Sequence, residues 1–162
     1  MSDKMVILWL LPIFVILHIV EEFVYPGGFL QWYRNYKSEI SPSFTVRYIA
    51  AINLILFILC MIPLSLDLPH AISLWLSMAS VVFFNALFHI RAVIKLKRYS
   101  PGTITSALLY IPLTIYGFWF VLSNNFASAG TVIVSSVVGL IYLWFSEFNH
   151  GRRAKKSQVK TN

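Results

Sequence analysis

Apolar residues dominate five long stretches of this chain, and short polar segments separate them. The stretches lie at residues 5–25, 44–66, 70–91, 102–123 and 126–147. A helix of about 20 apolar residues crosses about 30 Å of hydrocarbon, so each stretch is long enough to span a membrane. Asp67-Leu68-Pro69 and Asn124-Asn125 provide short turns between antiparallel neighbours. The pattern therefore predicts an all-α integral membrane bundle of five transmembrane helices, with residues 1–150 as one domain and 151–162 as a basic cytoplasmic tail.

The segment after the first stretch has a different pattern. Pro26-Gly27-Gly28 ends a helix, and residues 29–38 then combine aromatic and leucine side chains with Arg34 and Lys37. A short segment with one apolar and one basic face lies in the headgroup region of a bilayer. We therefore expect one short interfacial amphipathic helix at 29–38.

Composition agrees with a membrane protein. Hydrophobic residues make up 58% of the chain and charged residues 12%, whereas soluble domains carry about 25% charged residues. The mean hydropathy is +0.73. The single cysteine, Cys60, excludes a disulfide framework within one chain.

Lysine and arginine fall on alternate loops. The second and fourth loops contain neither residue. Apart from Lys4 before the first stretch, the basic positions lie in or beside the first loop, the third loop and the tail: Arg34, Lys37, Arg47, Arg91, Lys95, Lys97, Arg98, Arg152, Arg153, Lys155, Lys156 and Lys160. The positive-inside rule then places the N-terminus outside and the C-terminus in the cytoplasm. A net charge of +7 suits a protein held against anionic lipid, and we expect no nucleic-acid partner.

His18-Ile19-Val20-Glu21-Glu22 places an imidazole and two carboxylates near the end of the first stretch. An ionised carboxylate in hydrocarbon costs roughly 3 kcal/mol on insertion scales, so ionisable groups there indicate function. His18 shares a helix face with Glu21 at i+3 and with Glu22 at i+4. The two glutamates point about 100° apart on the helix. One is therefore expected to be a metal ligand together with His18, and the other to act as a general base or to pair with Arg91.

Two other stretches bring polar groups to the same depth if the helices alternate in direction. The third contains Asn85 and His89, at i and i+4, and the fifth ends in Glu147 and His150, an i, i+3 pair typical of carboxylate-bridged metal sites. Imidazoles and carboxylates that converge between helices suit a divalent Zn, Fe or Mn ion. The metal ligands predicted are thus His18, one or both of Glu21 and Glu22, His89, Glu147 and His150, with Glu21, Glu22 and Asn85 as candidate catalytic groups.

Simpler interpretations remain open for each group. The glutamates of the first stretch would lie in headgroup water if that helix ended early. Asn85 and His89 would serve as interhelical hydrogen-bond partners, and Glu147 and His150 would be solvated. The segment Tyr99-Ser100-Pro101-Gly102 is either a turn alone or one wall of the site, with Tyr99 or Ser100 offering a hydroxyl.

These motifs carry a resemblance. The run from His18 through Glu22 and on to Gly27, Asn85 to His89, Tyr99 to Gly102, and Pro112, in this order, resembles the HXXEE-domain family of small bacterial multi-span membrane proteins. That family has no assigned activity. The resemblance implies functional roles for His18, Glu21, Glu22, Asn85 and His89. The roles predicted for Glu147 and His150 rest only on their expected position at the same depth in the membrane.

The leading functional hypothesis is a membrane-embedded, metal-dependent hydrolase or oxidase that acts on a lipid or another amphiphile at the cytoplasmic leaflet. One alternative is a metal-free acid–base isomerase or lipid-binding protein that uses a buried glutamate. Another is a proton-coupled transporter or a structural membrane subunit. The absence of internal repeats disfavours a transporter, and the sequence leaves the oligomeric state open.

Overall fold

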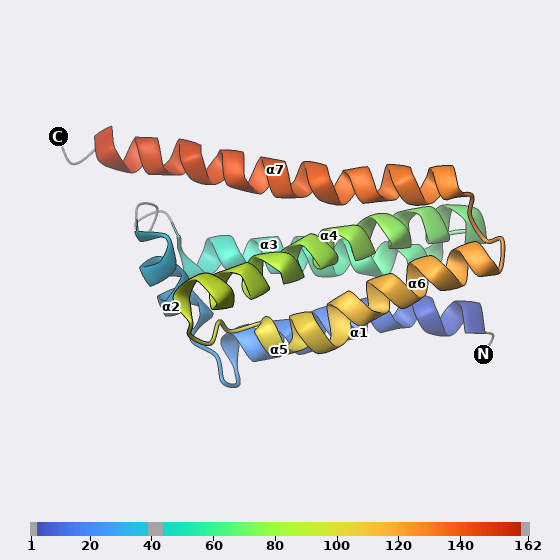
Figure 1. Ribbon diagram of the computed structural model, residues 1–162, viewed down its shortest axis with the longest axis horizontal. Coiled ribbons are helices and arrows are strands. Elements are labelled where there is room, and N and C mark those ends of the chain that lie inside the picture. The colour runs from blue at the N-terminus through green and yellow to red at the C-terminus, as the bar shows by residue number, and fades with distance from the viewer. Residues whose placement is uncertain (1–2, 39–43, 160–162) are drawn as a thin grey trace.

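The computed structural model describes residues 3–38 and 44–159, with side chains for 6–38, 44–149 and 152. All regular structure in these residues is helical (Figure 1). The elements are α1 (Asp3–Phe23), α2 (Phe29–Tyr36), α3 (Val46–Met61), the 3-10 helix η2 (Ile62–Ser65), α4 (Leu68–Leu96), α5 (Thr103–Thr105), the π-helix η3 (Ser106–Tyr110), α6 (Ile111–Ser123) and α7 (Ala129–Val159). Five segments are long and apolar enough to cross a membrane: Val6–Phe23, Val46–Ser65, Leu68–Leu96, Thr103–Ser123 and Ala129–Asn149. This confirms the predicted all-α bundle of five transmembrane helices.

Helix α4 is the centre of the bundle. It contacts α1, α3, α6 and α7, and 56% of its apolar segment is buried, against 11% for α7. Trp75 of α4 is fully buried. A β-carbon on Gly117 of α6 would lie 2.2 Å from the Trp75 ring, so the missing side chain of Gly117 makes room for this indole. Burial of one large ring against one glycine thus holds α4 against α6.

Small residues join α4 to α7. The Ser77 hydroxyl lies 3.4 Å from that of Ser135, and a β-carbon on Gly139 would lie 2.8 Å from backbone and side chain of Ser80. Small side chains allow close backbone approach, which is how membrane helices associate without a hydrophobic driving force between them. Helix α7 therefore packs on one side of α4 and is otherwise exposed, at the top in Figure 1.

The expected amphipathic helix is confirmed as α2. Its apolar face packs on the protein rather than only on headgroups, because Phe29 and Tyr33 are buried and Tyr33 stacks on Phe44 with 3.9 Å between ring centroids. The Arg34 guanidinium donates two hydrogen bonds to the carbonyl oxygen of Phe44, at 2.9 and 3.2 Å. Helix α2 thus covers one end of the bundle.

Two helices run further than the apolar stretches predicted. Helix α4 continues to Leu96 and α7 to Val159, whereas the apolar stretches end at 91 and 147. The backbone hydrogen bonds of a helix do not stop at the membrane boundary, and lysine and arginine are good helix formers. The basic segment after residue 150 therefore continues α7 up to Val159.

The same end of the bundle collects several helix termini. In Figure 1, α1, α4 and α7 run in the same direction, and their C-terminal ends lie at the left, beside α2 and the start of α5. Polar residues late in α1 and α4 are therefore brought to one level, next to the turn that enters α5.

Candidate functional site

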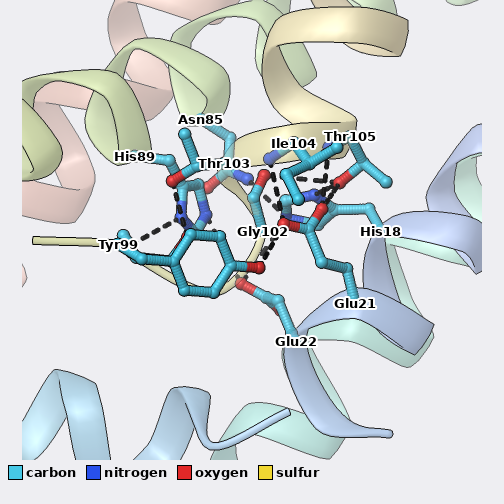
Figure 2. Close-up of polar contacts among 11 residues, drawn as sticks. His18, Glu21, Glu22, Asn85, His89, Tyr99, Gly102, Thr103, Ile104 and Thr105 are labelled. Carbon is cyan, nitrogen blue, oxygen red and sulfur yellow. Dashed lines mark hydrogen bonds and ion pairs between the residues drawn. The ribbon is translucent and has the colours of Figure 1, made fainter. Parts of the chain in front are cut away.

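Three ionisable side chains meet inside the bundle at that level (Figure 2). Glu22 and His18 lie one turn apart on α1, and His89 comes from α4. One oxygen of Glu22, Oε1, lies 3.5 Å from His18 Nε2 and 3.4 Å from His89 Nε2. All three residues are buried, with exposed fractions of 2%, 4% and 1% for His18, Glu22 and His89. We call these three side chains the His/Glu cluster.

The hydroxyl of Thr105 determines which nitrogen of His18 carries a proton. Thr105 Oγ1 donates its hydrogen to Glu21 Oε2, so it accepts from His18 Nδ1, 2.8 Å away. A neutral imidazole protonated at Nδ1 has a lone pair at Nε2. That lone pair faces Glu22 and accepts a hydrogen bond from the Asn85 amide at 3.3 Å. The Nε2 lone pair of His18 thus points into the cluster, where it can accept from Asn85 or bind an ion, but not both at once.

Glu21 belongs to a different set of contacts from Glu22. Its Oε1 accepts hydrogen bonds from the Tyr99 hydroxyl at 2.7 Å and the Ile104 backbone N–H at 2.9 Å. Its Oε2 accepts from the Thr105 backbone N–H at 2.7 Å and from the Thr105 hydroxyl. Free N–H groups at a helix N-terminus favour an anion, so Glu21 of α1 caps α5. Partial desolvation of the Tyr99 hydroxyl and its hydrogen bond to the Glu21 carboxylate raise the pKa of the phenol.

The turn between α4 and α5 forms one wall of the cluster. The buried Ser100 hydroxyl lies 3.2 Å from His89 Nδ1. Gly102, with φ at +93°, lies so close that an added β-carbon would be 2.7 Å from Cε1 of both His18 and His89. Of the two interpretations of residues 99–102, the structure supports the wall, because Tyr99 and Ser100 each contact a site residue.

Two of the three separations between ligand atoms in the His/Glu cluster match those of a metal site. Tetrahedral ions with N and O ligands at about 2.0–2.2 Å have ligand–ligand edges of about 3.3–3.6 Å. The two Glu22–imidazole distances, 3.5 and 3.4 Å, match such edges and exceed the 2.7–3.2 Å or so of an ordinary N–H···O bond. The three ligand atoms lie within 4.8 Å of one another. Each imidazole has its Nδ1 beside a hydroxyl and its Nε2 facing inward, which is how neighbouring groups orient metal-binding histidines.

Asn85 completes the polar surroundings. It is one turn before His89 on α4 and donates to His18 Nε2, the same atom that faces Glu22. Next to His18, the Tyr110 ring lies 4.8 Å away between centroids. The buried hydroxyls of Tyr110 and of Ser106, both in the π-helix η3, have no hydrogen-bond partner among the described residues. Single π turns occur often at functional sites, and these two hydroxyls are available to a polar molecule.

The structure does not bring Glu147 to the cluster. Glu147 is exposed on α7, and its Oε2 lies 3.7 Å from Lys37 Nζ. Helix α7 packs against the outer side of α4, so its C-terminal half lies beside α2 rather than beside α1. The backbone of His150 belongs to the same helix, and its side chain lies outside the described residues.

Arg91 is not the partner of Glu21 either. It is exposed on α4, in a groove that also contains Glu147. Glu21 is satisfied instead by backbone and hydroxyl donors of residues 99–105. Thr105, which joins Glu21 to His18, was not among the residues predicted from the sequence. Nothing in the sequence singled out this threonine, because its role depends on how α5 packs against α1.

The fold and the site define a helical membrane protein with a buried His/Glu cluster at one end of the bundle. The chain belongs to the family described as proteins of unknown function with HXXEE motif, whose family model matches residues 9–117. That match runs from within α1 to within α6, and it contains every member of the cluster. The comparisons with curated proteins and with solved structures each found no match.

Proposed function

We propose that this protein is a membrane-embedded enzyme in which His18, Glu22 and His89 hold a divalent metal ion, either Zn, Fe or Mn. One observation carries the proposal: inside the bundle, the Nε2 atoms of two buried imidazoles lie 3.5 and 3.4 Å from one carboxylate oxygen, separations typical of ligands on a shared ion. Two histidines and a carboxylate are a ligand set of zinc hydrolases and of non-haem iron oxygenases.

The ion would supply Lewis acidity to a water or carbonyl group, or one-electron chemistry in the case of iron. The protein's own residues position the reacting groups. Thr105 and Ser100 orient the two imidazoles, and Glu21 holds Thr105 in place. Asn85 offers an amide donor beside His18 that can orient a substrate oxygen. Glu21 is thereby assigned a positioning role, and Glu22 the role of ligand.

The substrate class we propose is a lipid or another amphiphile. The cluster lies within the last third of an apolar segment, Val6–Phe23. An apolar groove of about 560 Å³ runs between α1 and α3 at the same level, and Ile19, Val20 and Phe23 on α1, neighbours of the two glutamates in sequence, contribute to its lining. A chain in this groove would bring a polar headgroup to the depth of the cluster. The basic loops favour the cytoplasmic leaflet as the side from which the substrate arrives.

Elemental analysis of protein purified in detergent tests this proposal. We expect about one Zn, Fe or Mn per chain in the wild type, and none in the His18→Ala, His89→Ala double variant. His70→Ala is the matched control, because His70 is exposed and its Nδ1 contacts Asp67 at 2.8 Å, in the loop before α4. Wild-type protein that remains metal-free after growth and dialysis with each of the three ions would contradict the proposal.

A metal-free alternative is supported by the position of Glu22 between two imidazoles. A carboxylate with an imidazole on each side can take a proton from one substrate atom and return it to another, which is isomerase chemistry. Nitrogen-15 NMR of labelled histidine separates the two possibilities. Metal binding changes the Nε2 signals of both His18 and His89 when an ion is added, whereas a metal-free acid–base site leaves them unchanged.

A further inference from the structure

A second groove lies on the opposite side of α4 from the His/Glu cluster. It has a volume of about 510 Å³ and runs between α4, α7 and the end of α2. Its lining includes the cations Lys37, Arg91 and Lys95, one anion, Glu147, and several apolar side chains of α4 and α7. We call it the α4/α7 groove.

The charged groups of this groove do not balance. Glu147 Oε2 lies 3.7 Å from Lys37 Nζ, and the ammonium groups of Lys37 and Lys95 each lie 5.7 Å from the centroid of the Tyr36 ring. The exposed Arg91 guanidinium forms no ion pair within the described part of the chain. Three cations against one carboxylate leave two positive charges without a counter-charge on the groove wall.

The groove is also divided by polarity along its length. Phe84 and Leu87 of α4 and Leu143 of α7 line one part, and Arg91, Lys95 and Glu147 come later on the same two helices. At 1.5 Å per residue, the α4 wall from Phe84 to Lys95 is about 16 Å long, with its basic part at the end of the helix. A long apolar part that leads to a basic mouth matches an amphiphile with an anionic headgroup.

We propose that the α4/α7 groove binds one anionic glycerophospholipid from the surrounding bilayer. The phosphate lies between Arg91, Lys95 and Lys37, and an acyl chain follows Leu87 and Leu143. Guanidinium forks bind phosphate oxygens in a bidentate manner, and basic pockets between transmembrane helices bind anionic headgroups. Residues 148–162 of the sequence contain no aspartate or glutamate.

This lipid is distinct from the substrate of the proposed enzyme, and the inference does not depend on the metal. The lipid would connect α2 to α4 and α7, because Tyr36 and Lys37 of α2 form part of the groove. The bound lipid is expected to stabilise the end of the bundle that α2 covers.

Native mass spectrometry of the full chain from detergent tests the inference with two probes, phosphatidylglycerol and phosphatidylcholine of the same chain length. We expect one phosphatidylglycerol to bind at least tenfold more tightly than phosphatidylcholine. The Arg91→Gln, Lys95→Gln variant should lose at least tenfold of this preference. The control is Lys97→Gln, Arg98→Gln, which removes the same charge from exposed positions just beyond α4 that do not line the groove.

A third variant distinguishes a specific effect on lipid binding from loss of binding through misfolding. Glu147→Gln removes the anion that competes for Lys37, so it should strengthen phosphatidylglycerol binding severalfold. Equal loss in the Arg91 and Lys97 variants would show a diffuse basic rim and overturn the proposal. Competition by free inorganic phosphate would show that the groove binds the anion alone. A lipid-free dimer that the Arg91 variant disrupts would show that a second copy of the chain fills the groove. Either result would also overturn the proposal.

Discussion

The imidazoles of His18 and His89 meet edge to face, with 5.1 Å between ring centroids and 81° between ring planes. One ring comes from α1 and the other from α4, and Glu22 Oε1 touches the Nε2 atoms of both. A β-carbon on Gly102 would lie 2.7 Å from the Cε1 atom of each ring, so the backbone turn also approaches this pair closely. The pair is therefore held between a carboxylate and a backbone turn, and changes to either one should alter it in different ways.

Gly102→Ala should disrupt the cluster from the turn side. Alanine at φ +93° costs about 1–2 kcal/mol of backbone strain. In addition, its β-carbon would lie 2.7 Å from both imidazoles, and overpacking typically costs about 1–3 kcal/mol more. We expect lower stability by denaturant titration in detergent, and weaker metal binding.

Gly28→Ala is the control that separates the cost of backbone strain from the cost of overpacking against the imidazoles. Gly28 also precedes a helix with positive φ, +83°, and a β-carbon there would meet nothing within 4 Å. This variant should lose only the strain contribution and retain its metal. Equal losses in the two variants would mean that the close approach of Gly102 to the imidazoles has no energetic effect.

The two adjacent glutamates should respond oppositely to substitution by glutamine. Glu21→Gln replaces a carboxylate oxygen that accepts backbone hydrogen bonds with an amide that donates, and it removes an anion from the start of α5. Hydrogen bonds to charged groups contribute about 1.5–3 kcal/mol each, so a loss of at least that size in unfolding free energy is expected. Glu22→Gln removes a buried charge whose desolvation costs stability, so it should lower the unfolding free energy of the metal-free protein less than Glu21→Gln does, yet abolish metal binding.

Chemical denaturation of both variants after chelation, followed by metal titration, measures this difference. If Glu22→Gln proved the more destabilised variant and Glu21→Gln lost the metal, the roles assigned to the two carboxylates would have to be exchanged.

Thr105→Val should allow His18 to populate both neutral tautomers. Valine has the shape of threonine without the hydroxyl that accepts from His18 Nδ1. Loss of a group that orients a metal-binding histidine typically lowers metal affinity 10–100-fold. Thr105→Ser keeps the hydroxyl and should stay within a few-fold of wild type. Nitrogen-15 NMR of the metal-free protein provides the second readout: His18 should be protonated at Nδ1 in wild type and in Thr105→Ser, and a tautomer mixture should appear only in Thr105→Val.

The orientation in the membrane can be measured with two matched cysteines. Ser65 and Ser38 are both exposed, and the native Cys60 is buried. Ser38 follows α2, whereas Ser65 ends η2 after α3, which runs away from α2 to the opposite end of the bundle (Figure 1). In a Cys60→Ser background, Ser65→Cys should react with an impermeant maleimide in intact cells, and Ser38→Cys only after the cells are opened. The reverse result would place the C-terminus outside, together with the cluster and the basic loops.

Hydropathy along the chain was sufficient for the fold class, because the free energy of inserting a helix is a sum over its own residues and needs no partner. The same local reasoning gave α2 from its aromatic and basic pattern. It also gave the depth of His18, Glu22, Asn85 and His89, since depth follows from position along a helix at 1.5 Å per residue. Depth alone also suggested Glu147, which shares the level of the cluster and yet lies outside it, beside Lys37.

What only the tertiary structure decided is the direction in which each side chain faces. Rotation of a helix about its axis is set by packing between residues far apart in sequence, such as Trp75 against Gly117 and Ser77 against Ser135. That packing turns Glu22 toward His89 and places the start of α5 against Glu21. By itself the sequence determined which residues reach the same end of the bundle, because that depends on local hydrophobicity along each helix. Which of them meet depends on long-range close packing, and only the assembled bundle determines that.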